Sequence, residues 1–553
     1  MKQHSHASAC LVLLALLNAA PSSQAATRTA ESTVATPTAH TGSPIATDPL
    51  CCATKTRYPA PSRASVPAVP AGWRIVHTQM VARHGSRGLT RPGPDLGLLA
   101  VLRAARQEGA LTPLGEALER DVLALARAQA QLGTGRAEIA RPGHGNLTTL
   151  GIEEMQGLAQ RLHQRVAELF RPTADTAPIV EFAWSGVERA DQSARAFLAA
   201  LEQEVARSTG ARLQIRPTPG HTRYPENAPR RQPDGIDRFT LYFHKLEPAT
   251  DRAESRDDPN SAVYTASRNY QSYLGSERLK QRLAQFRARP LVAHITQATL
   301  AALFKPAFLE RLEAGTLRLD ARVEIDLPEV TGTSKRFAAN SRMLERPVDP
   351  GSVLEALYEL AIIAPLFERD LRLDFGAYLS PLARYVLFEL DDHENFYEKG
   401  PASTEVAPVT YAMAQGLLRD FFAQAEAAAQ AANSKTTPRA KFRFSHAEIV
   451  LPFILLLGLD RDAYALPEAE EYRYHSHPWR SARAVPMSAN IQWDTFVDRS
   501  GRAWVRMLHN ERWVAFKAAC AHARHRKHAA YYSLEGLRRC YAPDKPVSGR
   551  PAL

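Results

Sequence analysis

The sequence predicts an α/β fold, in which helices flank a mostly parallel sheet, together with a mainly helical insertion. One observation is an alternation of strand-like apolar runs, at 75–82 and 179–184, with segments of helical periodicity at 112–131, 151–170 and 193–205. Another is that residues 262–400 read mostly as helices, including 278–287, 297–314 and 353–366, with little strand signal. We therefore expect a sheet-containing core that is interrupted in sequence by a helical part.

The last third of the chain returns to the strand pattern. Residues 441–444 predict a short strand that ends at Ser445-His446, and the apolar run 449–457 predicts a buried helix, because it is too short to cross a membrane. The runs 491–496 and 503–508 flank a turn and predict a β-hairpin that rejoins the sheet.

The N-terminal region has a different composition from the rest. Lys2 precedes an apolar run at 11–17, and Ser23-Gln24-Ala25 offers small residues for cleavage, which is typical of a secretory signal peptide and too short for a membrane span. We expect the protein to be exported, to the periplasm or the extracellular space. The predicted division is a signal peptide at 1–25, a flexible Pro/Ala/Thr-rich segment at 26–70, the first part of the α/β core at 71–235, the helical insertion at 236–405 and the second part of the core at 406–545.

Charge favours anionic partners without identifying them. The 553 residues carry a formal net charge of +11 at pH 7. The only markedly basic short stretch, Arg524-His525-Arg526-Lys527-His528, lacks the interleaved aromatic residues of a strand-binding groove, so we interpret it as a solvated helix face and expect no nucleic-acid partner. The oligomeric state is not predicted.

Four cysteines remain once the leader is removed, and their even number suits an oxidising compartment. We expect Cys520 to pair with Cys540. The neighbours Cys51 and Cys52 make an uncomfortable pair, because adjacent Cα atoms lie about 3.8 Å apart and a disulfide prefers about 5.5 Å. No metal site is expected, since the chain holds no CxxC pair.

The pentapeptide Arg83-His84-Gly85-Ser86-Arg87 carries the strongest chemical signal. It places two guanidinium groups around one imidazole at a predicted strand end, an arrangement that suits a tetrahedral anion. Neighbouring positive charge disfavours the imidazolium, so His84 keeps a lone pair with which to attack phosphorus. The alternative is that both arginines are surface charges beside a turn.

A second histidine follows another predicted strand end, and an acid follows it. His446 and Glu448 supply what metal-free phosphoryl transfer needs besides a nucleophile, namely neutralisation of the equatorial oxygens and a proton for the leaving group. Taken singly, His446 also reads as a structural or surface histidine, and Glu448 as a first-turn carboxylate favoured by the helix dipole.

Together these residues resemble the histidine acid phosphatases. The resemblance is carried by a strand followed by RHGxR, by a distal Arg in a Ser-containing segment, and by a late His-Ala-Glu that is similar to the multiple inositol polyphosphate phosphatase branch. It spans about residues 53–515. Further stretches that agree with this branch are Lys55-Thr56-Arg57-Tyr58, Leu147-Thr148 with Gly151, Asp391 through Phe396-Tyr397-Glu398-Lys399-Gly400, and Met507-Leu508-His509-Asn510-Glu511.

The resemblance implies a histidine-phosphatase-like core and a role for each matching residue. His84 would form a phosphohistidine, and Glu448 would protonate the leaving group and then take a proton from water. No metal or organic cofactor is implied. The residues expected to bind substrate phosphate are Arg83, Arg87, Arg189, His446 and Lys399, the last of which also reads as a lysine that ends a helix before Gly400.

The sequence departs from the family pattern in two places. Leu89 stands where many acid phosphatases have Pro, which removes a stiffening residue from the loop after Arg87. The segment around Ser185 lacks the Ser-Thr-Asp spelling of fungal and mammalian relatives, which bears on Arg189.

The leading hypothesis is an exported phosphomonoesterase that acts on inositol polyphosphates, with an optimum on the acid side of neutrality. A broad-specificity histidine acid phosphatase is the alternative with the same mechanism. A non-catalytic binder of phosphate esters would need neither His84 nor Glu448, and an intracellular phosphoglycerate-mutase-like enzyme would need no leader.

Overall fold

The structure is a computed structural model. It describes residues 52–61, 66–172, 176–218, 235–251, 257–328, 335–434, 436–459 and 462–542. The predicted signal peptide at 1–25 and most of the segment at 26–70 lie outside these residues. Everything below concerns the described part of the chain.

An eight-stranded sheet forms the α/β part, in the order β10-β8-β7-β1-β6-β2-β3, with β9 paired to β8. β1, β6, β2 and β3 pair in parallel, whereas β7 to β10 join through antiparallel pairs. The strands are β1 (Arg74–Arg83), β2 (Ile179–Trp184), β3 (Gln214–Pro217), β6 (Ala440–Ser445), β7 (Asn490–Val497), β8 (Ala503–His509), β9 (Arg512–Val514) and β10 (Tyr532–Ser533). The predicted α/β class is confirmed, and the predicted hairpin is β7 with β8.

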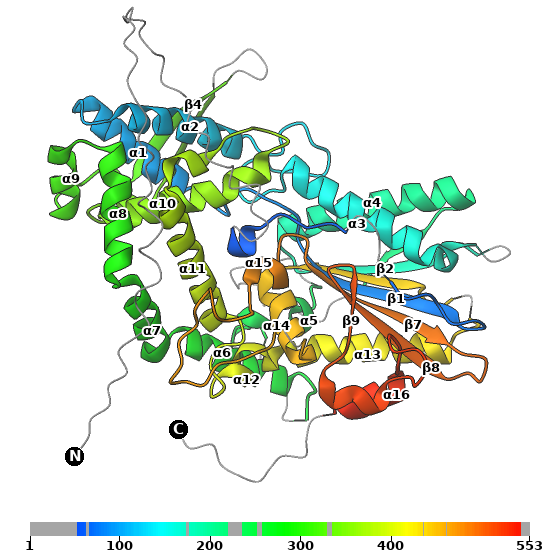
Figure 1. Cartoon of the computed structure of the whole chain (residues 1–553). Coiled ribbons are helices and arrows are strands. Elements are labelled where there is room, and N and C mark those ends of the chain that lie inside the picture. The colour runs from blue at the N-terminus through cyan, green and yellow to red at the C-terminus, as the bar shows by residue number, and fades with distance from the viewer. Residues whose placement is uncertain are drawn as a thin grey trace, which may run out of the picture. The chain divides into compact units, whose positions relative to one another are not determined.

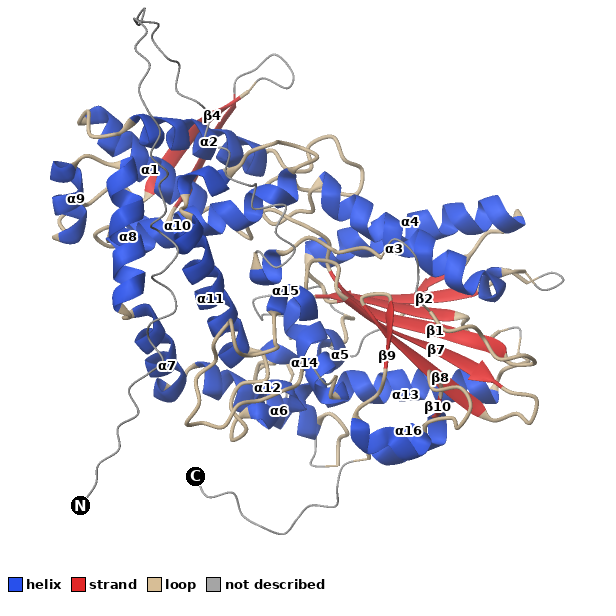
Figure 2. Ribbon diagram, in the orientation of Figure 1, coloured by secondary structure: helices blue, strands red, loops and turns tan. Residues whose placement is uncertain are grey.

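Helices cover both faces of this sheet, as Figures 1 and 2 show. Met80 and Ala82 of β1 face a core that they share with α3 and α4, whereas Val81 faces the core of α13 and α14. A strand buried on both faces needs apolar residues at consecutive positions, which is why residues 75–82 read as a continuous run. The helices of this part are α3 (Thr149–Val166), α4 (Glu188–Thr209), α5 (Arg238–Leu241), α6 (Ser261–Leu274), α7 (Glu277–Arg287), α12 (Ala407–Tyr411), α13 (Gln415–Gln430), α14 (Ala447–Leu457), α15 (Ser481–Ala484) and α16 (Leu534–Cys540).

A second hydrophobic core is almost wholly helical. Its elements are α1 (Pro94–Gln107), α2 (Pro113–Ala130), α8 (Pro290–Leu303), α9 (Pro306–Glu313), α10 (Pro350–Ile363) and α11 (Pro381–Glu398), with a hairpin of β4 (Arg322–Leu327) and β5 (Lys335–Asn340). All six helices begin at proline, whose fixed φ suits the first turn and whose missing N–H costs nothing there. Because α1 and α2 share this core with α8 and α10, early and late parts of the sequence build it together. The boundaries predicted for the domains stay a prediction.

Three local expectations differ from the structure. The segment 297–314 is not one helix but α8 and α9, which are separated before Pro306. The β4–β5 hairpin interrupts the region expected to be mostly helical. The stretch Arg524–His528 is not helical, because the preceding 3-10 helix η9 (Ala518–Ala523) ends first and residues 525–528 form a loop.

The end of the expected flexible segment is ordered against the core. Residues 53–55 form a 3-10 helix, η2 (Ala53–Lys55), and Thr54 and Tyr58 are buried. The Tyr58 hydroxyl donates to Glu511 and accepts from Asn490. The expectation of flexibility through residue 70 is therefore wrong for this stretch, because its polar groups have buried partners far along the chain.

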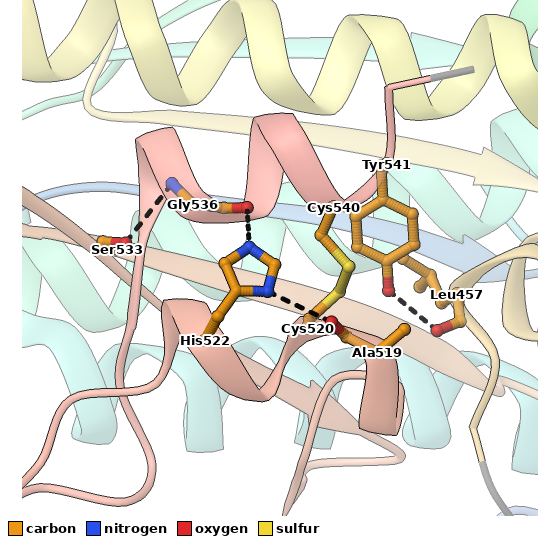
Figure 3. The surroundings of a disulfide bond; sticks show 8 residues. All are labelled: Leu457, Ala519, Cys520, His522, Ser533, Gly536, Cys540 and Tyr541. Carbon is orange, nitrogen blue, oxygen red and sulfur yellow. Dashed lines mark hydrogen bonds between the residues drawn. A yellow bond between two sulfur atoms is a disulfide. The ribbon is translucent and has the colours of Figure 1, made fainter. Parts of the chain in front are cut away.

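The predicted pairing of Cys520 with Cys540 is confirmed, and the disulfide joins η9 to α16 (Figure 3). Cys52 is also disulfide-bonded.

Within the described residues, one segment, Pro350–Phe367, is long and apolar enough to span a membrane by composition. Most of it is buried in the helical core, and buried core helices pass the same test.

Candidate active site

Three neighbouring parallel strands end at the residues that resemble catalytic groups. β6 lies between β1 and β2, and its last residue, Ser445, pairs with Arg83. His84 follows β1, His446 follows β6 and Ser185 follows β2. The rings of His84 and His446 lie 5.5 Å apart between centroids. Strand order therefore gathers residues that are more than 250 positions apart in sequence at one edge of the sheet, as expected for a ligand site on an α/β sheet.

The loop after β1 is shaped by two glycines that allow backbones to touch. A Cβ on Gly85 would lie 2.4 Å from the Gly151 carbonyl oxygen, and a Cβ on Gly151 would lie 2.0 Å from the Ser86 carbonyl oxygen. The Ser86 carbonyl also accepts a hydrogen bond from the Thr148 amide at 3.0 Å. These contacts explain why Leu147-Thr148 and Gly151 accompany the RHGSR loop in this sequence.

A buried carboxylate, Glu154 on α3, holds the same loop from below. It accepts hydrogen bonds from the amide and hydroxyl of Ser86, both at 2.8 Å, from the Tyr58 amide at 2.9 Å and from the Ser488 hydroxyl at 2.8 Å. Burial raises the pKa of this carboxyl, while its four donors act in the opposite direction. Glu154 thereby links the RHGSR loop to two other chain segments, around Tyr58 and Ser488.

The surroundings of His84 favour a neutral imidazole. Its ring is 2% exposed, and its Nδ1 lies 3.0 Å from the Gly85 carbonyl oxygen. A carbonyl only accepts, so Nδ1 carries the proton and Nε2 keeps its lone pair. Burial, together with the charges of Arg189, Arg87 and Arg83, holds the pKa of His84 well below its usual range. The imidazole is therefore neutral even in mildly acidic solution.

Three arginines surround this ring and are incompletely satisfied by the protein. Arg83 donates through Nη1 to the carbonyls of Thr54 and Val485, and Arg87 donates through Nη1 to the Gly88 carbonyl. The Nε atoms of Arg83, Arg87 and Arg189 are buried without a hydrogen-bond partner among the described residues. Burial lowers the pKa of Arg83 to about 10 and of Arg87 to about 9. A phosphate group supplies the oxygen acceptors and negative charge that such guanidinium groups favour.

His446 is the N-cap residue of α14, and its ring is one of the neighbours of the His84 ring. Its Nε2 lies 2.8 Å from the Ser185 hydroxyl, and its Nδ1 is buried without a partner among the described residues. Burial and the charge of Arg189 hold its pKa well below the usual value. Because the contact with Ser185 fixes the orientation of the His446 ring, its Nδ1 has a defined direction in which to meet a ligand.

Glu448 occupies the first turn of α14, and the structure departs from expectation in its protonation state. Its side chain is 37% exposed, and its Oε1 lies 3.6 Å from Nζ of Lys399. Burial opposes ionisation, but the ammonium of Lys399 above all, and also His244 and His446, hold the pKa of Glu448 well below its usual range. The free enzyme therefore carries an ionised Glu448, whereas the sequence-based mechanism needs the protonated form.

Lys399 is the C-cap residue of α11, where a positive charge complements the helix dipole, which agrees with one of its two sequence interpretations. Its Nζ also lies 3.6 Å from Oε1 of Glu448, a contact that the sequence did not predict. Its binding of a substrate phosphate stays a prediction. All seven site residues predicted from sequence thus lie at this one end of the sheet, linked by the contacts and electrostatic interactions given above.

Sequence reasoning missed several residues of this site. His244, in the 3-10 helix η4 (Phe243–Lys245), is buried, lowers the pKa of Glu448, and packs at 4.6 Å against Tyr242, whose ring lies 6.1 Å from His446. It follows an irregular Pro-rich stretch with no periodic pattern, so nothing local marked it. Ser185 carried a weak signal, because it follows β2 as His84 follows β1.

Comparison with known proteins identifies the family. The family model described as Histidine phosphatase superfamily (branch 2) matches residues 74–510. The chain belongs to this superfamily. It is a phosphatase, and the matched range includes all seven site residues predicted from the sequence. No curated protein sequence matches the chain significantly.

Solved structures agree with this assignment. The Bifidobacterium longum multiple inositol polyphosphate phosphatase in complex with inositol hexasulfate is 25% identical with a TM-score of 0.69, over 89% of this chain and 97% of that chain. The same protein in complex with phosphate is 25% identical with a TM-score of 0.70, over 90% of this chain and 98% of that one. The similarity thus extends over nearly the whole of both chains.

Proposed function

We propose that this histidine phosphatase removes phosphate from inositol polyphosphates through a phosphohistidine at His84, without a metal ion and outside the cytoplasm. The observation that carries the proposal is the lone pair of His84 Nε2 amid three buried guanidinium groups, with Glu448 at the open side. The substrate class is supported by the likeness to the Bifidobacterium longum phosphatase, whose complexes contain inositol hexasulfate and phosphate.

In the first half-reaction, Nε2 of His84 forms a bond to phosphorus while the bond from phosphorus to the ester oxygen breaks. Arg83, Arg87 and Arg189 neutralise the charge that spreads over the three equatorial oxygens. His446, fixed by Ser185, offers its remaining nitrogen to the same phosphoryl group. An inositol oxygen is a poor leaving group, so it needs a proton as the bond breaks.

Glu448 supplies this proton only after the substrate has changed its electrostatic surroundings. A polyphosphate brings negative charge next to the carboxylate and offers Lys399 a stronger anionic partner than Glu448. Both effects raise the pKa of Glu448, because each removes stabilisation of the ionised form. Lys399 thus passes from the acid to the substrate on binding, and Glu448 becomes protonated at the step that requires it.

In the second half-reaction, Glu448 is again a carboxylate and takes a proton from water. The water oxygen bonds to phosphorus, the bond between phosphorus and Nε2 breaks, and inorganic phosphate leaves. The proton that Glu448 gains replaces the one it lost, so the cycle closes without a cofactor.

Export is supported by the N-terminal composition and by the disulfide between Cys520 and Cys540, a bond that persists in oxidising compartments. Mass spectrometry of the protein made in its own host checks this part. Cleavage near residue 25 supports export, and retention of residues 1–25 contradicts it.

The catalytic proposal is tested by phosphate release from inositol hexakisphosphate and from an aryl phosphate, at acid pH with EDTA. We expect the wild type to hydrolyse both substrates and His84→Ala to reduce the activity on both by at least about 10⁴-fold. Glu448→Gln should reduce the activity on the inositol ester far more than the activity on the aryl phosphate, because the inositol leaving group needs the proton. Rapid alkaline quench of the wild type with labelled substrate should trap phosphohistidine, because its P–N bond is stable in alkali and labile in acid.

The outcomes separate the alternatives. Activity that needs an added divalent metal contradicts the mechanism. Much higher kcat/KM on the aryl phosphate than on the inositol ester indicates the broad-specificity phosphatase. Binding of both esters without turnover indicates a phosphate-ester binding protein.

A further inference from the structure

A wide basic groove lies at the other end of the sheet and has no part in the proposed chemistry. Its volume is about 1150 Å³, and it lies among α13, the start of β8, the loop after η9, and α16. The groove holds the basic stretch noted in the sequence, and we call it the basic groove. Its cationic lining residues are Arg502, Arg524, Arg526, Lys527, Arg538 and Arg539.

The groove lining carries a net positive charge, because six cations face three acids. Arg538 lies 3.5 Å from Glu426, and Arg539 pairs with Glu535 at 2.6 Å. The third acid of the lining, Asp498, accepts hydrogen bonds inside its own turn. The four cations that have no carboxylate partner among the described residues are Arg502, Arg524, Arg526 and Lys527.

The walls of the groove are fixed before any ligand arrives. The disulfide ties η9 to α16, His522 contacts the carbonyls of Ala519 and Gly536, and the Ser533 hydroxyl caps α16 (Figure 3). On the facing loop, Nδ1 of His525 accepts from the amides of Lys527 at 3.2 Å and His528 at 3.0 Å. Fixed walls reduce the entropy that binding must lose.

Strand register places the basic groove far from His84. Ala503, a lining residue at the start of β8, pairs with Val497 of β7, which pairs with Arg74, the first residue of β1. His84 follows the last residue of the same ten-residue strand. At about 3.3 Å per residue, the two sites are separated by roughly 30 Å.

The chemistry of the lining selects the kind of ligand. The indole of Trp504 is 6% exposed and is covered by the stacked ring of Trp73, at 5.1 Å, and by His525, so it offers no free face to a nucleic-acid base. None of the exposed large apolar side chains of the described residues lines the groove, which leaves nothing to insert into a lipid surface. Cations on three separate elements around one hollow suit a compact ligand with several anionic groups.

We propose that the basic groove is a second, non-catalytic binding site for a compact polyanion that carries several phosphate or sulfate groups. The inference rests on the proposed function only in expecting that this ligand class includes the substrate. Binding there proceeds without turnover, because the groove supplies fixed positive charge without the buried nucleophile and acid pair of the catalytic site.

Isothermal titration calorimetry with inositol hexasulfate tests the proposal. This ligand has no phosphate ester that the enzyme could hydrolyse during the titration. In low salt we expect wild type to bind two molecules of hexasulfate, one at the catalytic site and one in the basic groove. Arg87→Ala should retain the binding in the groove, which we call the groove event. The triple variant Arg502→Gln/Arg526→Gln/Lys527→Gln should weaken that event at least about tenfold and leave kcat on an aryl phosphate within about twofold. The groove event should also weaken steeply with added salt.

A matched variant controls for net charge. Arg318→Gln/Lys335→Gln/Arg346→Gln removes three exposed cations that likewise lack carboxylate partners among the described residues, and it should still bind two molecules. A single binding event in wild type, or two unweakened events in the groove variant, would overturn the proposal. Single-stranded DNA serves as a second probe. If wild type binds it, and the groove variant loses that binding while its hexasulfate binding is unchanged, the groove is a nucleic-acid site and the proposal is overturned.

The test of the basic groove can be distinguished from the test of the proposed function. Two-site binding that the groove variant weakens supports the groove even if wild type fails to hydrolyse inositol hexakisphosphate. Normal hydrolysis with a single binding event overturns the groove alone.

Discussion

The two ends of the central sheet both collect arginines, but they treat the charge in opposite ways. At the carboxyl end of β1, Arg83 and Arg87 are 3% and 7% exposed, and burial lowers their pKa values. At the amino end, Arg502 and Arg526 of the basic groove remain in solvent. A buried guanidinium has lost its water, so a phosphate restores interactions that it lacks, whereas an exposed one must exchange water for ligand.

This difference predicts strong, geometry-dependent binding at one end and weak, salt-dependent binding at the other. The burial of an arginine, rather than its being an arginine, therefore decides how it binds phosphate. The predictions below change one end at a time and run from the largest expected effect to the smallest.

Replacing Arg87 by Lys should have the largest effect. Lysine keeps the charge but loses the planar fork that fits phosphate oxygens, so we expect kcat/KM for the inositol ester to fall about 10²- to 10³-fold in steady-state assays. The control is Arg526→Lys in the basic groove, which should change kcat/KM less than about twofold. Equal losses in the two variants would remove the distinction between the ends.

Removing the disulfide should affect stability without affecting catalysis. The double variant Cys520→Ala/Cys540→Ala frees a loop with a sequence separation of 20, which corresponds to about 3 kcal/mol of chain entropy in the unfolded state. We expect a lower midpoint in thermal or denaturant unfolding and an unchanged kcat on an aryl phosphate. A large fall in kcat at a temperature where the variant is fully folded would mean that the two ends are coupled.

Lys399→Met should move the pH dependence of activity on the inositol ester to higher pH. In the empty enzyme, Lys399 holds the pKa of Glu448 down. A general acid acts only below its pKa, so activity is lost as pH rises through that value. Without the lysine charge the pKa of Glu448 rises, and the falling limb of kcat/KM for the inositol ester should move to higher pH.

The aryl phosphate provides the control for this variant, since its leaving group needs little protonation and its falling limb should not move. A limb that moves to lower pH for the inositol ester would contradict the ion pair between Lys399 and Glu448. Lys399→Arg should keep the wild-type profile.

Much of the catalytic end was predictable from sequence, because its residues follow short buried strands. The apolar run of β1 ends at His84 and that of β6 ends at His446, and parallel strands bring such ends together. His244 and the pairing of Lys399 with Glu448 were not predictable, since they come from packing between the end of α11, η4 and the start of α14. No local pattern encodes such contacts.

Some elements that were not predicted do have a recognisable pattern in the sequence. Arg322–Leu327 alternates exposed and buried positions as an edge strand does, but it lies within a helical region. The segment Pro94–Gln107 has apolar residues at helical spacing after a glycine and a proline. The basic stretch at 524–528 was misread as helix because its charges suggested a solvated face, whereas the His525 side chain bonds its own backbone into a loop.

The position of β6 has a consequence for how the protein is made. β6 comes from residues 440–445, yet it lies between β1, from residues 74–83, and β2, from residues 179–184. Until the ribosome has delivered that late segment, these two early strands have no partner between them, and the nucleophile loop lacks His446 and Glu448. A nascent or truncated chain is therefore inert, and a hydrolytic enzyme gains its activity only when nearly all of it has been synthesised.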